Sequence, residues 1–266
     1  MDTKKIIIYQ VFTRLFGNEH VQNKYNGTLA ENGCGKMDAF TQKALREIKK
    51  LGATHIWYTG IISHATQTDY SRYGMPANHP AIVKGKAGSP YAIRDYYDVD
   101  PDLAVVVPNR MQEFEALLKR THQNGLKAII DFVPNHVARQ YHSTAKPKNV
   151  KDLGEGDDNR KAFDANNNFY YIPGTKLGGE IDFYDAQAGT YEECPAKASG
   201  NNRFDAYPNK TDWYETVKLN YGVDYMGNTG NHFQPIPDTW CKMKDILLFW
   251  AGKGVDGFRC DMAEMV

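Results

Sequence analysis

The stretch LKAIIDFVPNH, residues 126–136, decides which architecture this chain can adopt. Its first eight residues form a short, largely apolar run rich in branched side chains, which predicts a strand. Pro134 cannot donate a hydrogen bond to a neighbouring strand, so it marks the carboxyl end of this one. Asn135 and His136 are therefore expected in the loop just beyond the strand, with Asp131 still inside it.

Strand-like and helix-like segments alternate along the rest of the chain. Apolar residues recur at helical spacing in three stretches, which end at a glycine or begin at a capping residue. This order of strand, loop and helix predicts an α/β fold. The predicted strands are 6–12 (IIIYQVF, expected to be buried), 54–62, 126–133 and 254–262, and the predicted helices are 41–52, 109–124 and 238–252, the last with Asp238 as its N-cap.

Residues 137–235 differ in character from the segments on either side. They are polar, rich in Gly, Asn, Pro and aromatic residues, and show no clear helical period. About 100 residues is too long for a structureless connection in a compact domain. We therefore expect a small inserted domain, irregular and leaning toward β structure, between the third strand and the last helix.

Four strands and about 165 residues remain outside this insertion. A complete (β/α)8 barrel, the TIM barrel, has eight strands and needs roughly 250 residues. The number of strands alone leaves two alternatives open. The chain holds about half a barrel, or it holds a complete four-stranded α/β sheet with an unusual insertion.

The stretch GFRCD, residues 257–261, ends the fourth predicted strand. Arg259 and Asp261 share one face of the strand, about 6.6 Å apart along it. An Arg beside a carboxylate favours the ionised form of that carboxylate. An oriented, ionised carboxylate is what a retaining glycosidase uses as its nucleophile, although such a pair taken alone is also a common structural ion pair.

Together, DxxxNH at 131–136 and GFRxD at 257–261, separated by an aromatic-rich insertion, resemble the α-amylase superfamily (glycoside hydrolase family 13). Other segments resemble the same family in the same order: YQVFTRLF at 9–16, PYAIRDYYDVDPDL at 90–103 and TVKLNY at 216–221.

This resemblance implies an α/β fold that is a partial TIM barrel, its first four strands, with the inserted domain after the third strand. The implied division is 1–136 for the first part of the barrel, 137–235 for the insertion, and 236–266 for the continuing barrel with its third helix and fourth strand.

The resemblance also implies roles for the residues that end these strands. Asp261 corresponds to the nucleophile that forms the covalent glycosyl-enzyme, and Arg259 orients it and keeps it ionised. Asp131 braces Arg259 and is mainly structural. His136 is implied to hydrogen-bond the sugar at the cleavage subsite, and Tyr91 to stack on the same sugar.

Calcium is the one cofactor that the resemblance raises. In many relatives an Asn like Asn135 supports a calcium ion beside the inserted domain. Where TVKLNY has Lys218, relatives usually have an acidic residue that binds the ion. The Lys218 ammonium can substitute for the charge of the cation, so calcium through Asn135 stays an alternative that Lys218 argues against. No other cofactor or metal is expected.

Two departures from the family pattern bear on specificity. Many amylases have Lys-His three and four residues after the nucleophile, on the leaving-group side, where this chain has Glu264 and Met265. Exo-acting α-glucosidases usually have an acidic residue directly after the stacking Tyr, where this chain has Ala92. The second departure favours an endo-acting or transglycosylating enzyme.

The general acid/base Glu of the family ends the fifth strand, outside the four predicted here. Retaining enzymes need two carboxyl groups about 5–5.5 Å apart, and Glu264 is expected to be a solvated loop carboxylate. The expected function is an α-amylase-type retaining hydrolase on α-1,4-glucans (starch, glycogen, maltooligosaccharides), of which this chain is a catalytically incomplete fragment. The alternatives are a transglycosylase or phosphorylase of the same superfamily, or a non-catalytic carbohydrate-binding relative.

The composition argues against several other classes. The 266 residues carry 32 basic and 32 acidic side chains, whereas nucleic-acid or anionic-membrane partners usually go with a basic excess. The four Cys show neither a zinc pattern nor a disulfide framework. MDTKKIIIYQVF lacks the features of a signal peptide, and no stretch approaches the roughly 20 apolar residues of a membrane span, so we expect a cytoplasmic protein. The oligomeric state stays open.

Overall fold

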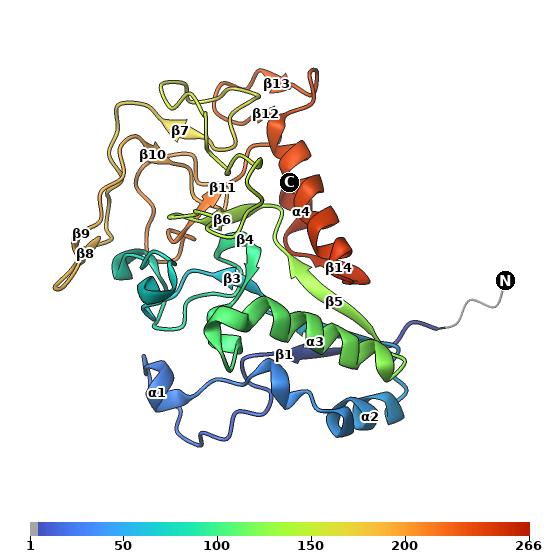
Figure 1. Cartoon of the computed structure of the whole chain (residues 1–266). Coiled ribbons are helices and arrows are strands. Elements are labelled where there is room, and N and C mark those ends of the chain that lie inside the picture. Colours follow the sequence, from blue (N-terminus) through green and yellow to red (C-terminus); the bar gives the residue numbers. More distant parts are fainter. Residues whose placement is uncertain (1–4) are drawn as a thin grey trace.

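A parallel four-stranded sheet forms the centre of the computed structural model, which describes residues 5–266 (Figure 1). The strands lie side by side in chain order: β1 (Ile8–Phe12), β2 (His55–Thr59), β5 (Lys127–Phe132) and β14 (Gly257–Cys260). All three pairings are parallel. The carboxyl ends of the four strands therefore meet at one edge of the sheet, where loops can gather functional side chains.

Three helices cover one face of the sheet: α2 (Gln42–Lys50), α3 (Arg110–Gln123) and α4 (Asp238–Gly252). The side chain of Thr41 caps α2 by accepting a hydrogen bond from the Ala44 amide. Trp250 is fully buried, and its indole nitrogen donates to the Tyr96 carbonyl at 2.8 Å. The core is built from the apolar stripes of these helices and from alternate side chains of the strands.

The opposite face of the sheet is open at β1. Tyr9 and Val11 pack against the core, but Ile8 is 50% and Phe12 36% exposed. The expectation that the strand within 6–12 is buried is therefore wrong. An apolar run predicts burial on both faces, whereas β1 lies at the edge of the sheet and packs on helices through one face only.

The N-cap expected for α4 is also wrong. Pro237 occupies the N-cap position and Asp238 is the first helical residue. The Asp238 carboxylate pairs with Lys242 at 2.9 Å and accepts a hydrogen bond from the Asn168 amide at 3.0 Å. Asp238 therefore ties the helix to the segment before it instead of capping its amides.

Residues 137–235 contain only very short strands, and this segment lies beyond the arrowhead of β5 in Figure 1. β6 (His136–Ala138) pairs antiparallel with β11 (Thr216–Lys218), so the end of the segment returns to the residues that follow β5. The division of the chain into domains stays a prediction. The other strands of the segment are β7 (Tyr171–Ile172), β8 (Tyr184–Asp185), β9 (Gly189–Thr190), β10 (Ala196–Lys197), β12 (Val223–Asp224) and β13 (Gly230–Asn231).

Two further strands, β3 (Ile62–His64) and β4 (Ile93–Val99), form an antiparallel pair between β2 and α3. A short helix, α1 (Leu29–Asn32), lies in the loop after β1. Single 3-10 turns occur at Met37–Ala39, Ser71–Tyr73, Pro80–Ile82, Pro101–Leu103, Val107–Asn109 and Ala263–Met265.

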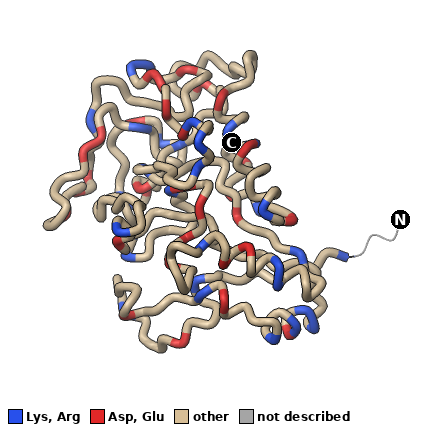
Figure 2. Tube along the Cα trace, in the orientation of Figure 1, with Lys and Arg blue, Asp and Glu red and all other residues tan. Residues whose placement is uncertain are grey.

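Charged residues of both signs are interspersed along the whole trace in Figure 2. Within residues 5–266, no helix has the length and apolar character needed to cross a membrane. The cytoplasmic location stays a prediction, in part because the start of the chain lies outside the described residues.

The packing of α3 can be tested with a matched pair of leucines. Leu117 of α3 is fully buried, whereas Leu248 of α4 is 61% exposed. Leu117→Ala should lower the free energy of unfolding by about 2–5 kcal/mol, because it removes buried apolar area and leaves a cavity. Leu248→Ala should cost less than about 1 kcal/mol, since most of its side chain is already in water. Urea unfolding followed by circular dichroism measures both, and equal losses would contradict this packing.

Candidate active site

Arg259 and Asp261 meet at the carboxyl end of β14, as the strand parity predicts. The Arg259 Nη1 donates to Asp261 Oδ1 at 2.6 Å. The Asp261 amide donates to the Phe132 carbonyl at 2.8 Å, which continues the pairing with β5 and fixes the position of Asp261. Asp261 is buried, while the Arg259 side chain is about one-third exposed. The carboxylate is thus held by one directed, charge-assisted hydrogen bond.

The same guanidinium faces Asp131, which lies opposite Arg259 on β5. Arg259 Nη1 is 3.4 Å from Asp131 Oδ1, and the Trp57 indole donates to Asp131 Oδ2 at 3.1 Å. Burial raises the pKa of Asp131, and the hydrogen bond from Trp57 and the charge of Arg259 oppose that shift. Partial burial disfavours the charged form of Arg259 and so lowers its pKa. The hydrogen bond to Asp261 acts in the other direction, and the pKa of Arg259 is raised overall.

Trp57 is a site residue that the sequence reasoning missed. The Arg259 guanidinium lies 5.1 Å from the centre of the Trp57 ring and 5.7 Å from that of Tyr91. Both distances suit cation–π contacts, which help to hold the guanidinium in place. Strand parity offered a signal, because Trp57 lies two residues before the end of β2, on the face of the sheet opposite the buried Tyr58.

His136 and Tyr91 lie together beside the Arg259 cluster. Both line a cavity of about 240 Å³, which also includes Lys84, Ser89, Trp213, Glu215 and Thr216. The His136 ring is 5.1 Å from the Trp213 ring. Burial lowers the pKa of His136 to about 4, with a further contribution from the charge of Lys218, while a hydrogen bond to the Tyr91 backbone opposes the shift. His136 is therefore a neutral hydrogen-bonding group at physiological pH.

Lys218 is buried next to Asn135, where its ammonium donates to two oxygens. One is Asn135 Oδ1, and the other is the carbonyl of Met265 in the loop after Asp261. The amide nitrogen of Asn135 donates to the Gly200 carbonyl at 2.8 Å. Burial lowers the pKa of Lys218 to about 8. Lys218 thus joins the inserted segment to the ends of both β5 and β14.

The donor set around Asn135 does not fit a calcium ion as it stands. Asn135 Oδ1 already accepts from the Lys218 ammonium, and a cation at this oxygen would have to displace that charge. Residues 5–266 hold no group of three His, Cys, Asp or Glu side chains arranged to bind a metal.

The loop after Asp261 turns sharply. Met262 adopts a left-handed backbone conformation with φ of +50°, which is uncommon for a residue other than glycine. A 3-10 turn spans Ala263–Met265, and Glu264 in it is exposed. No sequence signal predicts this turn, which carries Glu264 into solvent and Met265 back toward Lys218.

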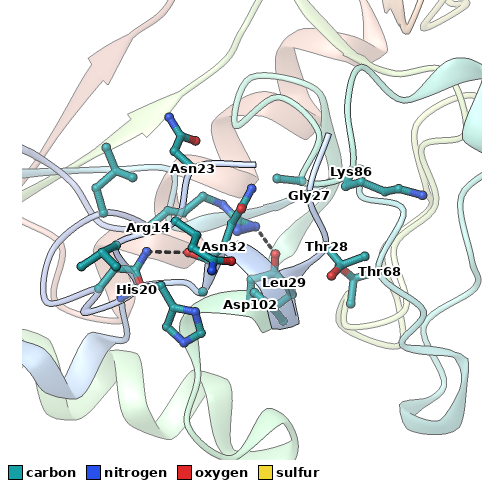
Figure 3. A pocket seen from close by; sticks show the side chains of 16 residues that line it. Arg14, His20, Asn23, Gly27, Thr28, Leu29, Asn32, Thr68, Lys86 and Asp102 are labelled. Atoms are coloured by element: carbon teal, nitrogen blue, oxygen red, sulfur yellow. Dashed lines mark hydrogen bonds and ion pairs between the residues drawn. The ribbon is translucent and has the colours of Figure 1, made fainter. Parts of the chain in front are cut away.

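A separate cavity of about 340 Å³ lies in the loop after β1 (Figure 3). Arg14 and Asp102 form an ion pair at its wall, and Asn23, Thr28 and Asn32 contribute polar groups. None of Asp261, Arg259, His136, Tyr91, Asp131 and Asn135 lines this cavity. The structure therefore gathers the predicted site residues in one place and leaves this cavity apart from them.

Comparisons with known proteins show the family to which this chain belongs. Residues 10–266 match the family model of the α-amylase catalytic domain. Probable oligo-1,6-glucosidase 2 of Bacillus subtilis (strain 168) is 27% identical over 266 residues, covering 99% of this chain and 35% of that protein. The amino acid transporter heavy chain SLC3A1 of Homo sapiens is 27% identical over 177 residues, covering 66% of this chain and 21% of that protein.

Solved structures show the same fold. An α-amylase from Lactobacillus plantarum superposes with a TM-score of 0.50 at 24% identity, covering 98% of this chain and 39% of that one. The four parallel strands thus belong to a TIM-barrel-like α/β fold. This chain spans about a third or less of the length of the two curated relatives.

The ionisation of His136 gives a direct test of the site's electrostatics. In an NMR titration, the His136 ring should stay neutral down to about pH 4. Because an unfolded histidine titrates near 6.5, this group should reduce stability as the pH falls from about 6.5 to about 4. Lys218→Met should raise the pKa of His136, since it removes a nearby positive charge.

Lys84→Met is the matched control, because Lys84 lines the same cavity but is not among the charges that lower the pKa of His136. A His136 pKa near 6.5 in the unaltered protein, or one that Lys218→Met leaves unchanged, would contradict the assigned environment.

Proposed function

Because this chain belongs to the family of α-amylase catalytic domains, whose members are glycoside hydrolases and transglycosylases, we propose that it carries the nucleophile half of a retaining active site for α-1,4-linked glucans. The substrates we propose are starch, glycogen and maltooligosaccharides. The observation that carries the proposal is the Asp261 carboxylate, buried and oriented by Arg259, whose guanidinium lies 5.7 Å from the centre of the Tyr91 ring. Tyr91 in turn lines the cavity together with His136.

Asp261 is proposed to attack the anomeric carbon. Arg259 binds Asp261 Oδ1, so Oδ2 is the oxygen left to form the bond to the sugar. The new carbon–oxygen bond forms as the glycosidic bond breaks, and the leaving oxygen takes a proton from a general acid. Water then attacks the glycosyl-enzyme, which releases a sugar with retained configuration and returns Asp261 as a carboxylate.

His136 and Tyr91 are proposed to hold the sugar at the cleavage position. A neutral imidazole both donates and accepts hydrogen bonds, which suits sugar hydroxyl groups. The Tyr91 ring is half-buried beside Arg259 and offers an apolar face for a pyranose ring. Asp131 is proposed as a positioning residue, since it contacts the same Arg259 nitrogen, Nη1, that donates to Asp261.

The general acid is proposed to come from residues other than those described. Retention needs a second carboxyl group about 5–5.5 Å from the nucleophile. Asp131 is engaged by Arg259 and Trp57, and Glu264 is exposed in the turn beyond Asp261. Coverage of about a third of the oligo-1,6-glucosidase relative supports a site that this chain supplies only in part.

Alternative functions are a transglycosylase or phosphorylase of the same family and a non-catalytic role. Ala92 after Tyr91 favours an endo-acting or transferring enzyme over an exo-acting glucosidase. The likeness to a relative named as a transporter heavy chain supports a non-catalytic role. The Arg259–Asp261 pair, together with His136 and Tyr91, retains the residues that the family uses for catalysis, which favours an enzyme.

The proposal predicts that residues 1–266 alone do not turn over maltooligosaccharides, since they lack the acid. A longer protein that contains this chain should be active. In it, Asp261→Asn should lower kcat by about 10⁴-fold or more, because no covalent intermediate can form. Reducing-sugar release measures turnover, and mass spectrometry with a slow fluorinated glycosyl donor should find the adduct on Asp261.

Glu264→Gln is the control, because it removes a neighbouring carboxylate that is exposed, and it should change kcat less than about threefold. Enzyme-like turnover by residues 1–266 that Asp261→Asn abolishes would refute the incomplete site. An adduct on another residue would refute Asp261 as nucleophile. Chromatography of the products separates hydrolysis from transfer.

We also propose that the Lys218 ammonium takes the place of a calcium ion. Neither EDTA nor added Ca²⁺ should move the thermal unfolding midpoint of the unaltered protein by more than about 1 °C. Lys218→Asp should need Ca²⁺ for stability, because it supplies a carboxylate beside Asn135 Oδ1 and the Met265 carbonyl. Lys218→Met is the control, and it should be destabilised without rescue by Ca²⁺. A midpoint that EDTA lowers in the unaltered protein would contradict the proposal.

A further inference from the structure

Arg94 in β4 is a buried arginine without an ion pair. Only 4% of the residue is exposed, and no carboxylate lies within 4 Å of its guanidinium in the described chain. Its neighbour Asp95 points away, toward the Ser143 hydroxyl and the Thr144 amide. The one hydrogen bond of the Arg94 side chain runs from Nη1 to Asn78 Oδ1, a long one at 3.4 Å. Burial lowers the pKa of Arg94, and the charges of Asp95, Asp100 and Asp98 oppose that shift.

The remaining edge of this guanidinium faces a cavity. Arg94 lines a space of about 440 Å³ between β4, the loop at 76–78 and the inserted segment. Across residues 5–266, neither Nε nor Nη2 of Arg94 makes a hydrogen bond, and neither is among the atoms sealed from solvent without a partner. These two nitrogens form the parallel fork that binds carboxylates and phosphates through two hydrogen bonds.

Two amide side chains whose nitrogens make no hydrogen bond in the described chain line the same cavity. Asn78 Oδ1 accepts from the Thr66 amide as well as from Arg94, and Gln140 Oε1 accepts from the His79 amide at 2.7 Å. Because a backbone N–H holds the oxygen of each side chain, the amide nitrogen of that side chain points away from this N–H. Neither nitrogen has a hydrogen-bond partner within the part of the chain that the structure describes, and both residues line the cavity.

The charge around the cavity is also unbalanced. Arg139 and Lys197 line the cavity together with Arg94. Arg139 and Lys197 both pair with the same acid, Glu193. Glu192 is the one acidic residue of the lining, and it is exposed and paired with Lys176. The lining therefore has donors and positive charge, and the buried carboxylates whose charge reaches Arg94 (Asp95, Asp98 and Asp100) form no ion pair with it in the described chain.

We propose that this cavity is a binding site for a small oxyanion, a carboxylate or a phosphate-type group, held by Nε and Nη2 of Arg94 and by the amide nitrogens of Asn78 and Gln140. The bound anion joins β4 to the first loop of the inserted segment, because Asn78, Arg94 and Gln140 come from three separate stretches. This site is distinct from the cleavage site, and its occupancy does not depend on the proposed catalysis.

Thermal unfolding of the purified protein tests the proposal. Phosphate and acetate are titrated separately against chloride at constant ionic strength and pH. At 100 times the dissociation constant, the oxyanion should raise the ratio of folded to unfolded protein about 100-fold, whereas chloride gives no saturable rise. The titration that saturates at the lower anion concentration shows whether the site prefers a phosphate or a carboxylate.

Arg94→Gln should lose this response, and Arg94→Lys should lose most of it, because a lysine lacks the fork. Arg160→Gln is the control, since it also removes one positive charge, but from a side chain that is 86% exposed and does not line the cavity. The response should be unchanged in this variant. An equal response in Arg94→Gln, or no saturable response in the unaltered protein, would overturn the proposal.

Crystals of the unaltered protein soaked in selenate give a second readout if Arg94→Gln does not fold. An anomalous selenium peak against the Arg94 fork supports the site, and its absence from the cavity in well-ordered crystals overturns it.

Discussion

One guanidinium, that of Arg259, is shared by two carboxylates at the carboxyl edge of the sheet. Asp131 on β5 and Asp261 after β14 both face it, and the rings of Trp57 and Tyr91 lie over it. Without this cation, two buried acids on neighbouring strands would face each other with nothing between them to offset their repulsion. The shared guanidinium therefore fixes the geometry of the two strand ends.

The sequence predicts the part of this arrangement that depends on local pattern. Strands β2, β5 and β14 and helices α2, α3 and α4 follow from apolar periodicity and from glycine stops. The facing of Arg259 and Asp261 follows from the alternation of side chains along a strand. Membership of the family follows from the spacing of two short motifs. Within each strand, helix or motif, the residues that make the pattern lie close together in the sequence.

The features that the sequence does not predict depend on partners far along the chain. The exposure of β1 is set by its place at the sheet edge, and the Asp238 carboxylate is drawn from capping by Lys242 and Asn168. Lys218 reaches Met265, 47 residues later, and Trp57 reaches Asp131, 74 residues later. No periodicity reports such contacts, because they depend on how the loops close in three dimensions.

Lys218 supplies the cation beside Asn135 from within the chain itself. The seam in question is the contact between the inserted segment and the loops that hold Asn135 and Met265. A bound metal ion would have a dissociation constant, so a seam held by such an ion would depend on the supply of metal and could be opened by a chelator. The Lys218 ammonium is tethered beside Asn135 and Met265 and is present once in every molecule. The variable that controls this seam is then proton concentration, since the ammonium loses its charge at a pKa of about 8.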